Sequence, residues 1–274
     1  MKKKLIPAVI SALSVIFILW IVWGNVTVGI TRCRVKSGRI PEGFDHYKIA
    51  VVSDLHNARF GENNIKITSL IEKENPDIVA VTGDLIDAKK PDFETAVHLA
   101  QELVKIAPCY YVTGNHEANI RERYAELEKK LLEAGVIILH DSSETIMRNG
   151  ERIQIAGLDD PYFTDSCLTV KERISAMNLT EDYTVLLSHR PENFSSYVSE
   201  NIDLVLSGHS HGGQFRLPFI GGLIAPNQAF LPKDDAGEFT ENNTTMIVSR
   251  GIGNSIIPIR FNNRPEIVIV ELNG

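Results

Sequence analysis

Several absences narrow the classes to which this 274-residue sequence can belong. It has three cysteines, Cys33, Cys109 and Cys167, and an odd number without a close pair excludes a disulfide framework. There is no internal repeat and no Gly/Ser-rich or Pro-rich linker, so most of the chain is expected to form one domain. Basic residues number 28 against 35 acidic ones. Without a basic stripe, nucleic acid is not expected as a partner.

Only one long apolar run is present, and it lies at the N-terminus. From Leu5 to Trp23 the chain carries 19 residues without a charge, which is close to the length needed to cross a bilayer. Lys2–Lys4 precede the run, and Trp20 and Trp23 stand where an interfacial aromatic belt would lie. A cleaved signal peptide is the alternative, but no Ala-x-Ala site follows Trp23. The predicted division is 1–24, cytoplasmic N-terminus and transmembrane anchor, and 25–274, one globular domain.

The orientation of this anchor depends on two groups of basic residues. The leading lysines favour an extracytoplasmic domain, whereas the cluster between Arg32 and Arg39 lies within the window that also influences topology. We expect the domain to lie outside the cytoplasm. Two interpretations of the cluster stay open, namely attraction to anionic lipid and a solvated strand face.

Five apolar runs in the domain end abruptly at polar residues. The runs begin at Lys48, Asp77, Cys109, Tyr183 and Ile202. Such runs are typical of strands buried on both faces, and ligands collect beyond the carboxyl ends of strands in α/β sheets. We therefore expect seven side chains to meet: Asp54, His56, Asp84, Asn115, His189, His209 and His211.

This set of side chains predicts a metal centre. Two carboxylates, an amide oxygen and four imidazoles suit Mn²⁺, Fe²⁺ or Zn²⁺. Seven ligands are too many for one catalytic ion but suit two ions bridged by a carboxylate, and the resulting net positive charge would attract phosphate. Taken singly, each residue is more simply a cap or a structural histidine. Five of the eight histidines fall at these strand ends, whereas His46, His98 and His140 do not and are interpreted as structural.

Together these blocks resemble the calcineurin-like metallophosphoesterase superfamily. The match extends over about residues 48–211, and two downstream segments, Gly212–Gln214 and Ser249–Gly253, resemble its bacterial membrane-anchored branch. The resemblance implies a metal-dependent phosphoesterase. Its ligand assignment is Asp54, His56 and His211 for one ion, Asn115, His189 and His209 for the other, and Asp84 as the bridge.

The resemblance also implies roles in catalysis. His116 would protonate the leaving group or steady the phosphoryl charge, and a hydroxide bridging the two ions would attack phosphorus. Glu117 and Asp87 would orient imidazoles, with helix capping or loop capping as the alternative. Two other functions stay open: an inactive scaffold that retains metal, and a secreted nucleotide phosphodiesterase or nuclease. The substrate classes include a lipid-linked phosphate, because an apolar loop at 215–224 follows His211.

Periodicity indicates the architecture of the domain. Helical faces are predicted around Phe93–Val104 and Ile120–Leu131, and Asn149-Gly150 predicts a tight hairpin. Further β-rich runs at Thr244–Ser249 and Glu266–Leu272 suggest a second sheet. The expected fold class is α/β, a four-layer αββα sandwich of two mixed β-sheets flanked by helices and preceded by one transmembrane helix.

Overall fold

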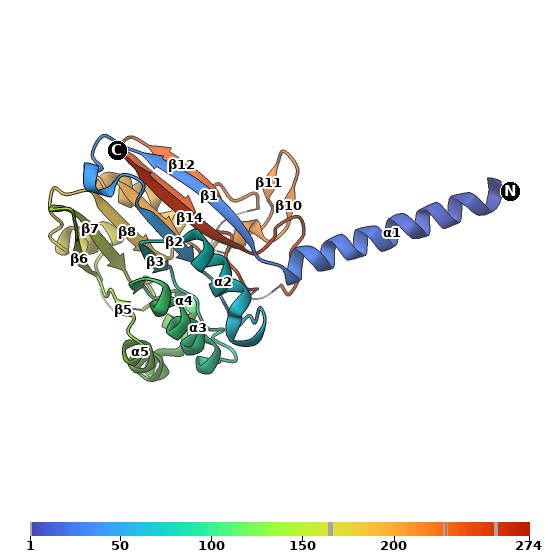
Figure 1. Cartoon of the computed structure of the whole chain (residues 1–274), viewed down its shortest axis with the longest axis horizontal. Coiled ribbons are helices and arrows are strands. Elements are labelled where there is room, and N and C mark those ends of the chain that lie inside the picture. Colours follow the sequence, from blue (N-terminus) through green and yellow to red (C-terminus); the bar gives the residue numbers. More distant parts are fainter. Residues whose placement is uncertain (1, 164–166, 227, 229, 255–256) are drawn as a thin grey trace.

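Two mixed six-stranded sheets lie face to face in the computed structural model, which describes residues 2–163, 167–226, 228, 230–254 and 257–274 (Figure 1). The first sheet has the order β1-β14-β2-β3-β4-β5 and the second β12-β13-β9-β8-β7-β6. The first contains β1 (Gly29–Lys36), β2 (Lys48–Val52), β3 (Ile78–Val81), β4 (Cys109–Tyr111), β5 (Ile137–Ile138) and β14 (Glu266–Asn273). The second contains β6 (Ser142–Arg148), β7 (Glu151–Leu158), β8 (Thr184–Ser188), β9 (Leu204–Ser207), β12 (Gly237–Glu241) and β13 (Thr244–Val248).

Helices cover the outer face of each sheet. The helices are α2 (Ile65–Glu74), α3 (Phe93–Ile106), α4 (Asn115–Ile120), α5 (Tyr124–Glu133), α6 (Val170–Ala176) and α7 (Phe194–Ser199). Leu99 and Leu127 pack in the core between the first sheet and its helices, and Ile174 and Tyr197 in the core beside the second. A third core, between the sheets, contains Ile49 from β2 and Val185 from β8. These three cores confirm the four-layer αββα sandwich.

One expectation about the strands is confirmed and another is wrong. The hairpin at Asn149-Gly150 joins β6 to β7 as predicted, and both turn residues have positive φ, as a type I′ turn requires. The last two β-rich runs, however, do not form a sheet together: β13 joins the second sheet, and β14 the first. Strand β14 lies between β1 and β2 and pairs with both, so it is buried along most of its length.

The basic cluster after the anchor forms part of a strand face. Arg32 pairs with Glu74, and Arg39 Nε lies 2.6 Å from an Asp203 carboxylate oxygen. Strand β1 pairs in parallel with β14 through eight residue pairs. The structure therefore favours the strand-face interpretation of these arginines over the lipid one.

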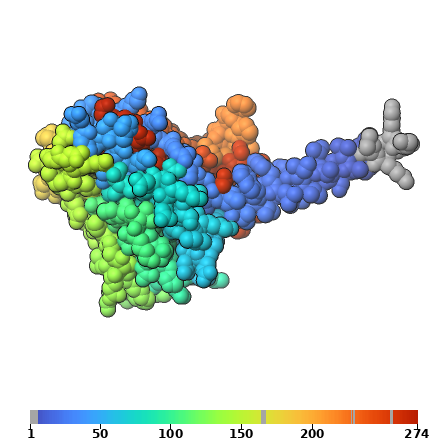
Figure 2. All heavy atoms as spheres, viewed as in Figure 1, coloured from blue at the N-terminus to red at the C-terminus, as the bar shows by residue number. Residues whose placement is uncertain are grey.

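Helix α1 (Lys2–Val26) extends away from the domain, as Figures 1 and 2 show. Its segment Ile6–Val26 is long and apolar enough to cross a membrane, and its most apolar stretch is not buried against the domain. The domain end of the helix is docked, because Phe17 and Trp20 pack against the ring of Phe261. The three cysteines are unpaired, in agreement with the absence of a disulfide framework.

The carboxyl ends of the central strands meet at one edge of the sandwich. In the first sheet β2, β3 and β4 run parallel, and in the second β7, β8 and β9 do so. A hairpin of two short strands, β10 (Arg216–Leu217) and β11 (Gly221–Gly222), follows the turn at His211–Gly213. This edge holds the side chains described next.

Candidate metal centre

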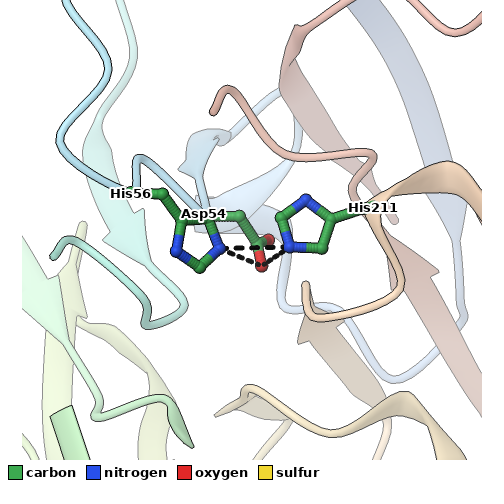
Figure 3. A group of neighbouring side chains, drawn as sticks. All are labelled: Asp54, His56 and His211. Atoms are coloured by element: carbon green, nitrogen blue, oxygen red, sulfur yellow. Dashed lines mark hydrogen bonds and ion pairs between the residues drawn. The ribbon is translucent and has the colours of Figure 1, made fainter. Parts of the chain in front are cut away.

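Asp54, His56 and His211 form the first group of potential ligands, although they come from both sheets. Asp54 and His56 follow β2, and His211 follows β9. Figure 3 shows the two imidazoles on either side of the Asp54 carboxylate. His211 Nε2 lies 3.4 Å and His56 Nε2 3.8 Å from Asp54 Oδ1, and the two nitrogens are 3.1 Å apart.

A second group contains His189, Asn115 and His209. His189 Nε2 lies 3.2 Å from both Asn115 Oδ1 and His209 Nδ1. The Nδ1–H of His189 donates to the carbonyl oxygen of Thr82 at 2.7 Å, so Nε2 is the ring nitrogen that could coordinate an ion.

Asp84 lies between the two groups. Its Oδ2 is 3.5 Å from His56 Nε2 and 3.3 Å from His189 Nε2. Neighbouring ligands on one ion with bonds of about 2.1 Å are expected about 3 Å apart. The spacing and the mixture of nitrogen and oxygen donors therefore fit two borderline divalent ions that share Asp84.

The buried imidazoles and carboxylates of the centre shift one another's pKa. Burial raises the pKa of Asp84, but the imidazole of His189 outweighs it and holds that pKa well below its usual value. Burial lowers the pKa of His189, yet Asp84 outweighs this effect and raises it to about 10. The pKa of His56 is also raised, by Asp54 and Asp84 acting against burial. Burial and the neighbouring cations lower the pKa of His209 and of His211, the latter to about 3. The two carboxylates therefore favour the protonated forms of His56 and His189, whereas His209 and His211 favour the neutral form.

The backbone at the strand ends is unusual. Five of the seven residues have positive φ, a region that non-glycine residues rarely adopt and that stores about 1 kcal/mol or more of strain at each position. They are Asp54 (53°), His56 (45°), Asp84 (55°), His209 (65°) and His211 (47°). Hydrogen bonds hold this geometry, since Ser53 Oγ donates to Asp54 Oδ2 at 2.5 Å and His209 N–H to Oδ1 at 3.1 Å.

Glycines allow the loops to approach one another closely. A β-carbon on Gly208 would overlap Ser53 Oγ, and one on Gly251 would lie 2.6 Å from Asp54 Cβ. At Gly114 it would overlap the Asp84 carboxylate. The loop that contains Gly251 therefore packs directly against Asp54. The Ser249–Gly253 segment alone does not reveal this contact.

His116 lies beside the first group rather than within it. Its ring stands edge-on to that of His56, with centroids 4.4 Å apart. The backbone N–H of Ala88 donates to His116 Nδ1 at 2.9 Å, so the neutral imidazole carries its proton on Nε2. Burial lowers the pKa of His116.

The two acids expected near the imidazoles act mainly on the backbone. Glu117 accepts hydrogen bonds from the N–H groups of Asp84, Ile86 and Gly114, at the first turn of α4. Asp87 accepts from the N–H of Lys89 at 2.8 Å. Glu117 therefore acts as a helix cap. Asp87 caps its loop, and it also lies within 4.8 Å of ring nitrogens of His56 and His116.

The remaining histidines lie outside these groups. His46 bonds Glu271 on the surface, and His98 lines a surface pocket beside Arg59. His140 contacts two carboxylates, Asp159 at 2.7 Å and Glu128 at 2.9 Å. Their expected structural roles agree with these positions.

Sequence reasoning missed Arg190, which contacts the second group, and Asp160, which holds Arg190 in place. Arg190 Nη1 lies 3.0 Å from His209 Nε2, and its Nε donates to Asp160 Oδ2. Asp160 follows β7, so a sixth strand ends at the same edge in a polar residue. A signal was present in the sequence, because Arg190 directly follows His189.

Most of this region matches the model of a known protein family. A family model described as calcineurin-like phosphoesterase matches residues 47–213. An uncharacterized metallophosphoesterase of Bacillus subtilis (strain 168), YkuE, is 30% identical over 257 residues, which cover 89% of this chain and 85% of that protein. Phosphodiesterase YaeI of Escherichia coli (strain K12) is 28% identical and covers 82% of each chain.

Two further comparisons concern the anchor and the fold. A Danio rerio transmembrane protein with a metallophosphoesterase domain is 28% identical, covering 89% of this chain and 57% of that protein. The solved structure of TT1561 from Thermus thermophilus superposes with a TM-score of 0.52 at 15% identity, covering 75% of this chain and 89% of that one. At this identity the likeness concerns the fold alone.

Proposed function

The chain belongs to the calcineurin-like phosphoesterase family, and from this premise we propose that it is a membrane-anchored, two-metal hydrolase of a phosphate ester or pyrophosphate. Members of this family are metal-dependent phosphoesterases. The single observation that carries the two-metal proposal is the position of Asp84 Oδ2, 3.5 Å from one group of ligands and 3.3 Å from the other.

Each proposed ligand has a defined place in this assignment. Asp54, His56 and His211 would hold one ion, Asn115, His189 and His209 the second, and Asp84 would bridge them. Bound Mn²⁺, Fe²⁺ or Zn²⁺ ions would lower the pKa of water and neutralise charge on phosphoryl oxygens. The centre's two carboxylates leave a net positive charge with two such ions, which favours an anionic substrate.

The protein's own residues supply the remaining chemistry. His116 carries its proton on Nε2, because Nδ1 accepts the N–H of Ala88, so the neutral ring would donate a hydrogen bond to the leaving-group or phosphoryl oxygen and stabilise the charge that develops there. The Nδ1–H bond of His189 to Thr82 fixes the orientation of its ring. Burial of the ligands excludes water from the far side of the centre.

Activity is favoured over an inactive scaffold, because all seven ligand positions carry residue types that can bind metal, His116 is present, and these side chains converge. The nuclease alternative is weakened by the net charge of −7. Among substrate classes, a diester is favoured by the relative named phosphodiesterase. A lipid-linked phosphate is favoured by the apolar helix α1 and by the exposed side chains of Phe219 and Ile220 in the β10–β11 hairpin.

The test is a substrate profile of the full-length protein in detergent, loaded with Mn²⁺. One aryl monoester, one diester and one pyrophosphate are compared, and bound metal is measured in the same samples. Hydrolysis of at least one class is expected. If the protein carries two ions and hydrolyses none of them, the scaffold function replaces the proposal.

We also propose that the catalytic domain, residues 25–274, lies outside the cytoplasm and that 1–24 forms the cytoplasmic N-terminus and anchor. Cys167 offers a direct test, since it is exposed whereas Cys109 is buried. A membrane-impermeant maleimide should label the protein in intact cells, and the Cys167→Ser variant should lose most of that label. Labelling that requires cell lysis would place the domain in the cytoplasm.

A further inference from the structure

A cavity of about 210 Å³ lies where α1 meets the domain, and we call it the junction cavity. Residues of the helix form one wall and residues of the 250–264 segment the other. Its lining consists of Trp20, Ile21, Trp23, Gly24, Arg250, Arg260, Asn262, Asn263 and Arg264. None of the candidate metal ligands lines this cavity.

Specific contacts hold the two walls together. Asn25 Nδ2 donates to the carbonyl oxygen of Arg260 at 2.9 Å, and Asn25 Oδ1 accepts from the Arg260 N–H at 2.8 Å. The guanidinium of Arg264 lies over the ring of Trp23, 4.6 Å from its centroid. Trp20 and Trp23 suit the interfacial layer of a bilayer, which would place the junction cavity at headgroup depth.

The junction cavity is positively charged although the chain carries a net charge of −7. Of its three arginines, only Arg250 has an ion-pair partner in the part of the chain that the structure describes, Glu266 at 3.5 Å. The side chain of Arg250 is 33% exposed and donates no hydrogen bond to any described residue. Arg264 uses Nε and Nη2 on the carbonyls of Thr27 and Val28, which leaves Nη1 available.

We infer that the junction cavity binds the phosphate-bearing headgroup of an anionic phospholipid. Guanidinium groups match phosphate oxygens in charge and geometry, and basic pockets beside membrane helices suit such headgroups. A lipid is favoured over a free anion because the helix wall is continuous with the exposed apolar surface of α1, where acyl chains would lie.

A second membrane contact would keep the junction cavity against the bilayer. The β10–β11 hairpin projects from the same end of the domain as α1, and Figure 2 shows it as an orange knob beside the helix. Phe219, between its strands, is fully exposed, and Ile220 is 59% exposed. Exposed apolar side chains at this place suit the bilayer interface.

The junction cavity is also connected to a proposed metal ligand. Asn263 Nδ2 donates to the carbonyl oxygen of His211 at 2.7 Å, and Arg260 Nη2 lies 3.3 Å from His211 Nδ1. A bound headgroup would therefore lie one layer of side chains from the centre. Binding itself requires neither metal nor turnover, so it is tested separately from the proposed hydrolysis.

The two tryptophans of the chain, Trp20 and Trp23, both line the junction cavity, so their fluorescence reports on it directly. Full-length protein in detergent with a chelator is titrated with dioctanoyl phosphatidylglycerol, dioctanoyl phosphatidylcholine and inorganic phosphate. A saturable change with phosphatidylglycerol is expected, at least about tenfold tighter than with the other two, and native mass spectrometry should count one lipid.

Variants then locate the binding. Arg250→Gln removes the guanidinium that faces Glu266 at 3.5 Å, and Asn262→Glu adds a repelling charge at an exposed wall position. Each should weaken phosphatidylglycerol binding about tenfold or more, whereas Arg152→Gln, on β7 of the second sheet, should leave it unchanged. Melting curves without lipid verify folding, and Asn262→Glu remains informative if Arg250→Gln unfolds.

Two results would overturn the inference. Unchanged phosphatidylglycerol affinity in folded Arg250→Gln and Asn262→Glu would place the lipid elsewhere. Inorganic phosphate binding as tightly as phosphatidylglycerol would make the junction cavity a site for a free anion.

Discussion

The backbone N–H of Ala88 donates a hydrogen bond to Nδ1 of His116 at 2.9 Å. This bond selects the tautomer in which the neutral imidazole carries its proton on Nε2. A peptide N–H from the β3–α3 loop thus prepares the Nε2–H of an α4 side chain to donate a hydrogen bond.

Replacement of His116 should separate chemistry from metal binding. His116→Gln is expected to keep two ions but to lose about 10²–10³-fold in turnover, because the Nε2–H that would serve the leaving-group oxygen is absent. The loss should be smaller for an aryl phosphate, whose leaving group needs no proton. Steady-state kinetics with alkyl and aryl substrates measure the two losses in turnover. Equal losses on both substrates would assign His116 to electrostatic stabilisation of the phosphoryl group. Loss of metal would make His116 a ligand.

Replacement of Asp84 should instead affect both ions. Asp84→Asn exchanges the carboxylate between the two groups for a neutral amide, so metal occupancy should fall and turnover should nearly vanish. Elemental analysis of variant and parent decides the matter. A variant with two tightly held ions and normal turnover would exclude the bridging role.

Metal binding should release protons, because His56 and His189 have raised pKa values in the metal-free centre. At pH 7 the binding of two ions is expected to release protons, above all from His189, whose pKa is about 10. Affinity should therefore rise with pH as these groups deprotonate. Calorimetry in buffers of different ionisation enthalpy counts the protons; a count near zero would mean that both imidazoles are already neutral.

A histidine outside the centre should control stability at alkaline pH. The hydrogen bond to Asp159 outweighs burial and raises the pKa of His140 to about 9, above an unfolded value near 6.5. Its stabilisation is complete below about pH 6.5 and disappears as pH rises through about 9. His140→Gln should thus narrow the difference in Tm between pH 7 and pH 10 by a few degrees.

His98→Gln is the matched control for this experiment, since His98 lies on α3 away from both carboxylates. It should melt like the parent at both pH values. If His140→Gln also keeps the parent's full pH dependence, the two carboxylate contacts of His140 do not contribute to stability.

The hairpin provides a test of the proposed lipid-linked substrate. Phe219 and Ile220 are its most exposed apolar side chains, whereas Leu223 is partly buried and its N–H donates to the carbonyl oxygen of Gly213. The double variant Phe219→Ser, Ile220→Ser should keep activity on a short-chain ester but lose several-fold on its long-chain homologue in vesicles. Equal treatment of both substrates by parent and variant would remove the hairpin from substrate capture.

The positions of the candidate ligands could be predicted because they depend on a short-range pattern. Each of five buried strands ends in a polar residue, and parallel strands bring those ends to one edge. Arg190 and Asp160 escaped prediction because Asp160 follows a strand whose first half belongs to an exposed hairpin, which hid the pattern.

Other features could not be predicted because they depend on contacts between distant segments. The strained φ of Asp54 is held by Ser53 and by the His209 N–H, more than 150 residues away. Likewise, Gly251 is small because Asp54 lies against it, and Arg260 bridges helix α1 and the centre. The run of Ile and Val in β14 indicates a strand that is buried on both faces. It does not indicate that the neighbouring strands are β1 and β2.

The parallel pairing of β1 with β14 has a consequence for biosynthesis. Residues Gly29 and Glu266 are partners, so the strand that follows the anchor helix has its sheet partner only after more than 230 further residues have been made. Until then β2 also presents a free edge, and pairing across such a distance is slow. A nascent chain that stops before Glu266 contains the helix and every candidate ligand but has an open sheet, which exposes it to proteases and to aggregation.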